Sequence, residues 1–186
     1  MALIKGTNDY SGLIEAYESS TIKNIVEVSG KALVIYKQPM LGKAVLSEAL
    51  IDIWEEQSVD GYNLGMLLLT VGGVQQIVFA ADIKDITQEY DSANVVIGSK
   101  VTMRSLDNKL ICSELIADIY AYQTSAVNLE LTMVTRVIDN EPIIIPNKSI
   151  RFIYENDGSY VLEFNDTRDR MIIVEAPNAL FLAQPQ

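Results

Sequence analysis

The feature that most constrains the fold is a series of short apolar runs broken by tight-turn residues. Gly72-Gly73 interrupts the stretch from Met66 to Ala80, and glycine tolerates the positive φ that a two-residue hairpin turn requires. Asn156-Asp157-Gly158 interrupts the stretch from Ser149 to Phe164 in the same way. Because hairpins pair neighbouring strands, the sequence predicts an antiparallel sheet rather than a parallel one.

Weaker patterns of this kind extend the β content along most of the chain. Apolar runs bounded by turn residues predict strands at 22–28, 31–37, 95–103, 128–135, 143–145 and 170–175, with a last short one at 179–183. The runs after Asn128 form a C-terminal meander. The expected fold is mainly β (α+β): an antiparallel sheet, sandwich or open barrel with a C-terminal meander and one or two helices.

Helical spacing is clearest from Lys43 to Gln57. Its apolar residues share one face, and Trp54 on that face is expected in the core. A short helix is also predicted from Asp82 to Tyr90, with Asp82 as its cap. The stretch 107–122 fits a helix or an alternating strand. Helix is the preferred interpretation, although the period of a short apolar run does not separate the two.

The length of 186 residues fits one domain. Residues 1–20 are polar and small, and we expect an N-terminal arm or a short helix over Leu13 to Glu18. Residues 21–186 are expected to form a single β-rich globular domain. No internal repeat of convincing period is found, and a chain of this size needs no disulfide or metal to hold its core together.

Charge and targeting signals limit the partners and the location. The chain has 25 acidic and 14 basic residues, a net charge of −11, which disfavours binding to nucleic acid or to anionic membranes. The N-terminus shows no signal peptide, and no apolar run approaches the roughly 20 residues of a membrane span. We therefore expect a soluble protein in the cytoplasm or a virion, acting as a homo-oligomer or as a subunit of a larger protein assembly.

The chain contains no histidine. Histidine is the commonest general base near neutral pH and the commonest metal ligand, so serine and cysteine triads, HExxH zinc sites and facial-triad iron sites are excluded. Cys112 is alone, which excludes an intrachain disulfide and a cysteine-based zinc site, and its apolar neighbours predict a buried, inert thiol. We expect no catalytic residues, no cofactor and no metal.

Three weaker candidates for chemistry are better explained by structure. The first is a set of acids that alternate with apolar residues on predicted strands, as on an ordinary solvent face: Glu27, Glu130, Glu163 and Glu175. The second is a calcium site at acidic turns, where turn chemistry is the preferred explanation but ion binding stays open: Glu155, Asn156, Asp157, Asn165, Asp166 and Asp169. The third is an aromatic stacking platform, for which a core or rim position is preferred: Tyr120, Tyr122, Tyr154 and Tyr160.

Composition and pattern leave three functional hypotheses. The preferred one is a non-enzymatic structural or assembly subunit, in its most concrete form a viral particle component such as a capsid-decorating, head or tail protein. Sheet edges and extended arms are the usual means of such assembly. The alternatives are a β-sheet binding or adaptor module for a protein, peptide or glycan, and an enzyme such as a glycosidase that works through carboxylates.

Overall fold

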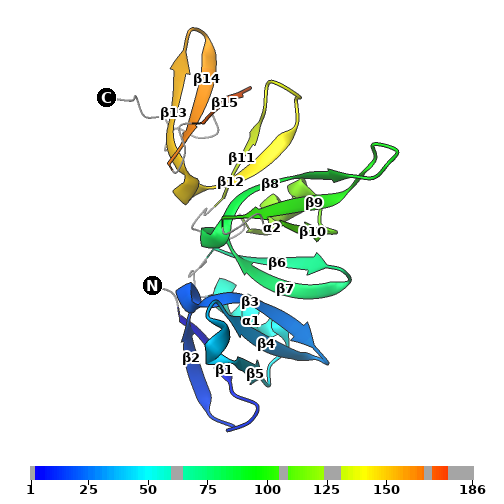
Figure 1. Cartoon of the computed structure of the whole chain (residues 1–186), viewed down its shortest axis with the longest axis vertical. Helices are drawn as coiled ribbons and strands as arrows, with labels where there is room; N and C mark the ends of the chain where they lie inside the picture. Colours follow the sequence, from blue (N-terminus) through cyan, green and yellow to red (C-terminus); the bar gives the residue numbers. More distant parts are fainter. Residues whose placement is uncertain (1–2, 60–64, 105–108, 124–130, 166–168, 176–186) are drawn as a thin grey trace.

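The computed structural model describes residues 3–59, 65–104, 109–123, 131–165 and 169–175. These residues form a mainly β protein of antiparallel sheets that do not close into a barrel, with two α-helices, as the sequence predicts. Figure 1 shows that successive parts of the chain are stacked along the long axis of the molecule, from the N-terminal strands at the bottom to the C-terminal strands at the top.

The same run of elements occurs three times, which the sequence reading does not detect. Each run consists of a hairpin, a 3-10 turn, a second hairpin and a fifth strand, and we call the runs units 1, 2 and 3. Unit 1 comprises β1 (Leu3–Thr7), β2 (Ile14–Glu18), η1 (Ser19–Thr21), β3 (Ile22–Val28), β4 (Lys31–Tyr36), η2 (Pro39–Leu41), β5 (Lys43–Leu46) and α1 (Leu50–Val59).

Units 2 and 3 repeat this order. Unit 2 comprises β6 (Met66–Val71), β7 (Val74–Phe79), η3 (Ala80–Asp82), β8 (Ile83–Tyr90), β9 (Val96–Met103), β10 (Lys109–Cys112) and α2 (Ile116–Gln123). Unit 3 comprises β11 (Leu131–Thr135), β12 (Pro142–Pro146), η4 (Asn147–Ser149), β13 (Ile150–Asn156), β14 (Ser159–Phe164) and β15 (Arg170–Ile173). Only a few equivalent positions keep similar residues, which explains why no convincing period is visible in the sequence.

The strands of each unit are arranged in the order second, first, fifth, fourth, third. The first and fifth strands meet at single bridges, Asn8 with Leu46 and Arg136 with Ile173, and at the equivalent pair in unit 2. The third strand of one unit then pairs with the second strand of the next, β3 with β7 and β8 with β12. Edge-to-edge pairing therefore joins the three units in series.

The junctions also share cores. Hairpin β6–β7 turns Leu67 and Val78 toward the core of its own unit, while Ile77 and Phe79 pack into the core of unit 1. Hairpin β11–β12 does the same one unit later, because Ile144 is fully buried in the core of unit 2. Alternate residues of a strand face opposite sides, so one hairpin can serve as a wall between two cores.

Four segments differ from the sequence prediction. The stretch Leu13 to Glu18 contains strand β2, and Asp82 to Tyr90 contains strand β8, rather than short helices. In β8 a β-bulge between Ile83 and Asp85 shifts the alternation of inward-facing and outward-facing side chains. The buried residues Ile83 and Ile86 are therefore three positions apart, as on one face of a helix. The predicted helix from Lys43 divides into β5 and α1, and the ambiguous stretch 107–122 contains both β10 and most of α2.

Other predictions are confirmed. The hairpins around Gly72-Gly73 and Asn156 to Gly158 both form, and both glycines of the first pair have positive φ. In the second hairpin Asn156 pairs with Ser159, so the turn consists of Asp157 and Gly158. Trp54 is 7% exposed, and its indole N–H donates to the carbonyl of Met66. The strand predicted at 179–183 lies outside the described residues. Across the described part of the chain, no helix has the length and apolar character to cross a membrane.

Candidate functional site

Charged side chains gather where one unit meets the 3-10 turn of the next. The residue after the fourth strand, Lys37 in unit 1 and Arg104 in unit 2, reaches across the junction. Lys37 Nζ lies 2.8 Å from Asp82 Oδ1, and an Arg104 guanidinium N–H donates to the Ser149 hydroxyl. The two junctions therefore use the same position of the unit for a polar contact between units.

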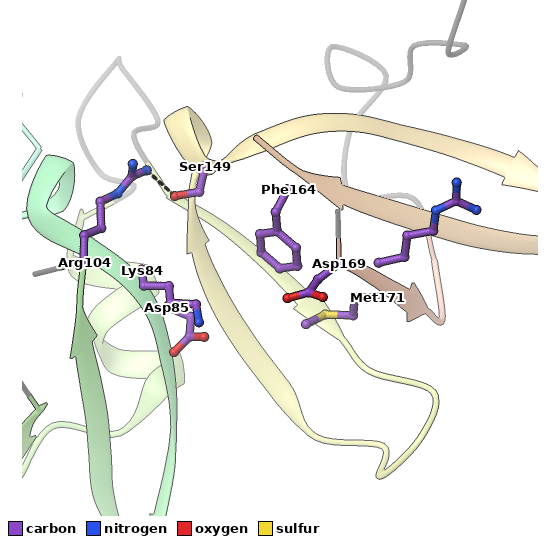
Figure 2. Close-up of a pocket in the computed structure, with 8 residues that line it drawn as sticks. Lys84, Asp85, Arg104, Ser149, Phe164, Asp169 and Met171 are labelled. Carbon is purple, nitrogen blue, oxygen red and sulfur yellow. Dashed lines mark hydrogen bonds between the residues drawn. The ribbon is translucent and has the colours of Figure 1, made fainter. Parts of the chain in front are cut away.

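The junction between units 2 and 3 contains a cavity of about 450 Å³ (Figure 2). Figure 2 shows Lys84, Asp85 and Arg104 of unit 2 on one side and residues of unit 3 on the other. The unit 3 lining consists of Ser149, Phe164, Asp169, Arg170 and Met171. The cavity is thus a product of the edge-to-edge junction and is not contained within one unit.

The lining of this cavity is a mixture of opposite charges around an aromatic ring. Arg104 also donates to the carbonyl of Ile83, and Arg170 Nε lies 2.9 Å from Glu163 Oε1, so both guanidinium groups are engaged by the protein. Asp85 and Asp169 come from different units. Within the described ranges, no three acidic or thiol side chains gather in a way that could hold a metal ion. The contact between Arg104 and Ser149 joins unit 2 to unit 3 through polar groups.

In units 1 and 2, a glutamate just before the helix accepts hydrogen bonds from a backbone N–H of the first strand. Both carboxylate oxygens of Glu48 accept the backbone N–H of Thr7, at 2.8 and 2.9 Å, and Glu114 accepts the N–H of Thr70 in the same way. Burial acts to raise the pKa of Glu48, but the bonds from Thr7 outweigh it and keep that pKa below its ordinary value. The sequence signal for this contact, a Ser-Glu pair before each helix, was missed.

The structure does not bring together the carboxylates considered as an acid pair. Glu27 lies in β3 of unit 1, whereas Glu163 lies in β14 of unit 3, and Glu130 is outside the described residues. The hydroxyl of Tyr154 donates to Glu163, and burial together with this bond raises the pKa of the tyrosine. Glu175 is an exposed residue just after β15. Glu27 and Glu163 therefore lie in different sheets and do not form a pair.

The acidic turns do not converge either. The turn at Asn156 and Asp157 lies at one end of the β13–β14 ladder, whereas Asn165 follows the other end of β14. Asp157 has a φ of 50°, so it is a turn residue for backbone reasons. Asp166 lies outside the described residues. A calcium site that uses both groups of residues is therefore not formed by this geometry.

The four tyrosines do not form a common platform among the described side chains. Tyr120 lies on α2 against the core of unit 2, and Tyr160 lies on β14 against the core of unit 3. Tyr154 is 7% exposed in β13. The side chain of Tyr122 is outside the described part. Tyr120 and Tyr160 thus cover separate cores, and Tyr154 is buried, in agreement with the preferred interpretation of the sequence.

We expect Cys112 to be unreactive while the protein is folded. Its side chain is 2% exposed, and burial, with a smaller effect of Glu114, raises the pKa of the thiol to about 11. Since the thiolate is the reactive form, native protein at about pH 8 should show almost no alkylation, and urea-unfolded protein should take up one label. Mass spectrometry of both samples checks this, and rapid labelling of the native protein would show that the thiol is accessible.

Comparisons with known proteins identify no relative. No family model, curated protein or solved structure matches this chain. The basis for assigning a role is therefore the geometry of the chain itself, in which the units, their shared cores and the junction between them are the distinctive features.

Proposed function

We propose that this chain is a non-enzymatic structural subunit that works by assembling with other protein chains. The observation that carries the proposal is that units 1 and 2 each complete their core with the first hairpin of the following unit. Ile77 and Ile144 are both fully buried in the core of the unit before their own. In tandem arrays of this kind stability comes largely from contacts between neighbouring units.

The distribution of side chains supports the same role. The described polar clusters serve the protein's own framework: Glu48 and Glu114 hold backbone amides, and Lys37 and Arg104 tie one unit to the next. Charged groups that serve a reaction are usually desolvated and directed into a cleft. The four side chains named above bridge elements of the sheet, which fits a protein that acts by assembling through its sheet edges.

A component of a virus particle is the most concrete form of this proposal. Particle proteins act by packing against copies of themselves, and a serial sheet with polar junctions suits that task. If the proposal holds in this form, the neighbouring genes encode particle proteins, and mass spectrometry of purified particles detects the chain at a fixed ratio to them. Neighbouring genes for metabolic enzymes, and absence from the particles, would contradict it.

Solution measurements test the general proposal. Pure protein should associate as concentration rises, or should bind a protein encoded beside it, in sedimentation velocity and multi-angle light scattering. Concentrations up to about 1 mM detect association with a Kd of that order. A chain that stays monomeric alone and with each of its gene neighbours would refute the assembly role.

A further inference from the structure

We infer that copies of this chain join head to tail, the outer edge of β13 in one copy pairing antiparallel with the outer edge of β2 in the next. The outer edge of each strand is the side that does not face its hairpin partner. This inference rests on the assembly role proposed above and adds the partner, the strands and the register. Its basis is that the chain already contains this junction twice.

The two internal junctions have the same register. Ile25 of β3 faces Ile77 of β7, and Ile86 of β8 faces Ile144 of β12. Ile25 and Ile86 are each the fourth residue after a 3-10 turn, and Ile77 and Ile144 are each the third residue before one. A third junction built by the same rule would place Ile153 of β13 opposite Ala16 of β2.

Both strands are available at the ends of the molecule. Among the described strands, β2 pairs only with β1, and β13 pairs only with β14. Figure 1 shows β2 near the bottom and β13 near the top of the long axis. One chain therefore presents the two halves of the junction at opposite ends, which permits head-to-tail contact between copies.

The backbone of β2 is oriented for this pairing. The N–H of Asn8 donates to the carbonyl of Leu13 at 2.8 Å, whereas the N–H of Thr7 is held by Glu48. Because bonded and non-bonded pairs alternate in an antiparallel ladder, the N–H and C=O of Ala16 point to the outer edge of β2. Ile77, the equivalent residue of unit 2, uses that edge to face β3.

One apolar side chain at this end is exposed where its equivalents are buried. Met66 and Leu131 open the first strands of units 2 and 3, and they are 2% and 3% exposed in the core of the preceding unit. Leu3 occupies this position in unit 1 and is 46% exposed. In the proposed contact, unit 3 of the preceding copy would cover Leu3, as unit 1 covers Met66 within one chain.

The same register fixes a second facing pair. At the internal junctions Val26 faces Gln76 and Thr87 faces Ile143, so Tyr154 of one copy would face Glu15 of the next. The contact is heterologous, so its rotation decides whether copies close into a ring or extend as a filament.

A proline at the outer edge tests the pairing. Ala16→Pro removes the outward N–H while leaving the bonds to β1, and proline is tolerated where an edge N–H faces solvent. We expect wild-type protein to associate and Ala16→Pro to associate at least about tenfold more weakly, because an interface hydrogen bond is lost and the ring blocks close approach. Ala16→Ser keeps the N–H and should associate like wild type. Circular dichroism of both variants verifies that the monomer is folded. Sedimentation equilibrium gives the dissociation constants of the wild type and of both variants.

The outcomes separate this inference from the general proposal. Multimers that form equally well in folded Ala16→Pro would overturn the β13–β2 pairing and leave the assembly role in place. A wild type that binds only a neighbouring gene product, and never itself, would do the same. A wild type that binds neither would overturn both.

Discussion

Replacing Gly98 by alanine is expected to lower the free energy of unfolding by on the order of 3–5 kcal/mol. Gly98 lies in β9 with a φ of 157°, and a Cβ atom there would lie 2.0 Å from the carbonyl oxygen of Cys112. That oxygen belongs to the backbone of the neighbouring strand β10, so it cannot move aside as a flexible side chain can. Either the β9–β10 ladder separates or the strand distorts. Urea denaturation followed by circular dichroism measures the loss.

Gly73→Ala is the matched control. Gly73 has a φ of 80°, but no atom lies within 4 Å of the position its Cβ would take. Only the left-handed conformation is then penalised, by about 1–2 kcal/mol. A Gly98→Ala variant that is no less stable than Gly73→Ala would show that β9 and β10 are not packed as closely as described.

Ile144→Ala should destabilise unit 2 although Ile144 belongs to unit 3. The side chain is fully buried in the core of unit 2, and truncating a buried isoleucine to alanine costs about 2–5 kcal/mol. Because the cavity opens beside Ile86 and Val101, amide exchange should accelerate in β8 and β9 as well as in β12. Hydrogen exchange with mass spectrometry measures this strand by strand.

Ile138→Ala is the control for that experiment. Ile138 lies in the same unit but is 90% exposed in a turn, so its truncation should change stability by less than about 0.5 kcal/mol. If Ile144→Ala accelerates exchange only in unit 3, the units do not share a core, and the structural basis of the proposed assembly role is lost.

The predictions that the structure confirms depend on local chemistry. Gly72-Gly73 and Asp157-Gly158 form turns because their own backbones adopt positive φ there, and the flanking strands pair with immediate neighbours. The buried position of Trp54 follows from its place on the apolar face of α1. Such features need only a few consecutive residues, so the sequence alone is sufficient to identify them.

The helix predicted at residues 82–90 is wrong because the conformation of this segment depends on strands that are distant in the sequence. Ile83 and Ile86 are spaced as on a helix, yet both are buried in a strand, because the bulge before Asp85 adds one residue to the alternation. The bulge is stabilised by pairing with β9 and by the contact with β12. Neither partner is visible in a window of eight residues.

The sequence by itself determined the hairpins, the mainly β content and the lack of histidine-based chemistry, because these depend on turn residues, alternation and composition. The tertiary structure alone revealed the three units and the sharing of cores between them. Pairs such as Ile25 with Ile77 and Ile86 with Ile144 join residues far apart in the chain, and only a few equivalent positions are similar enough to suggest a repeat. This long-range pairing also explains why, among the described strands, β2 and β13 each keep one unpaired edge at the two ends of the molecule.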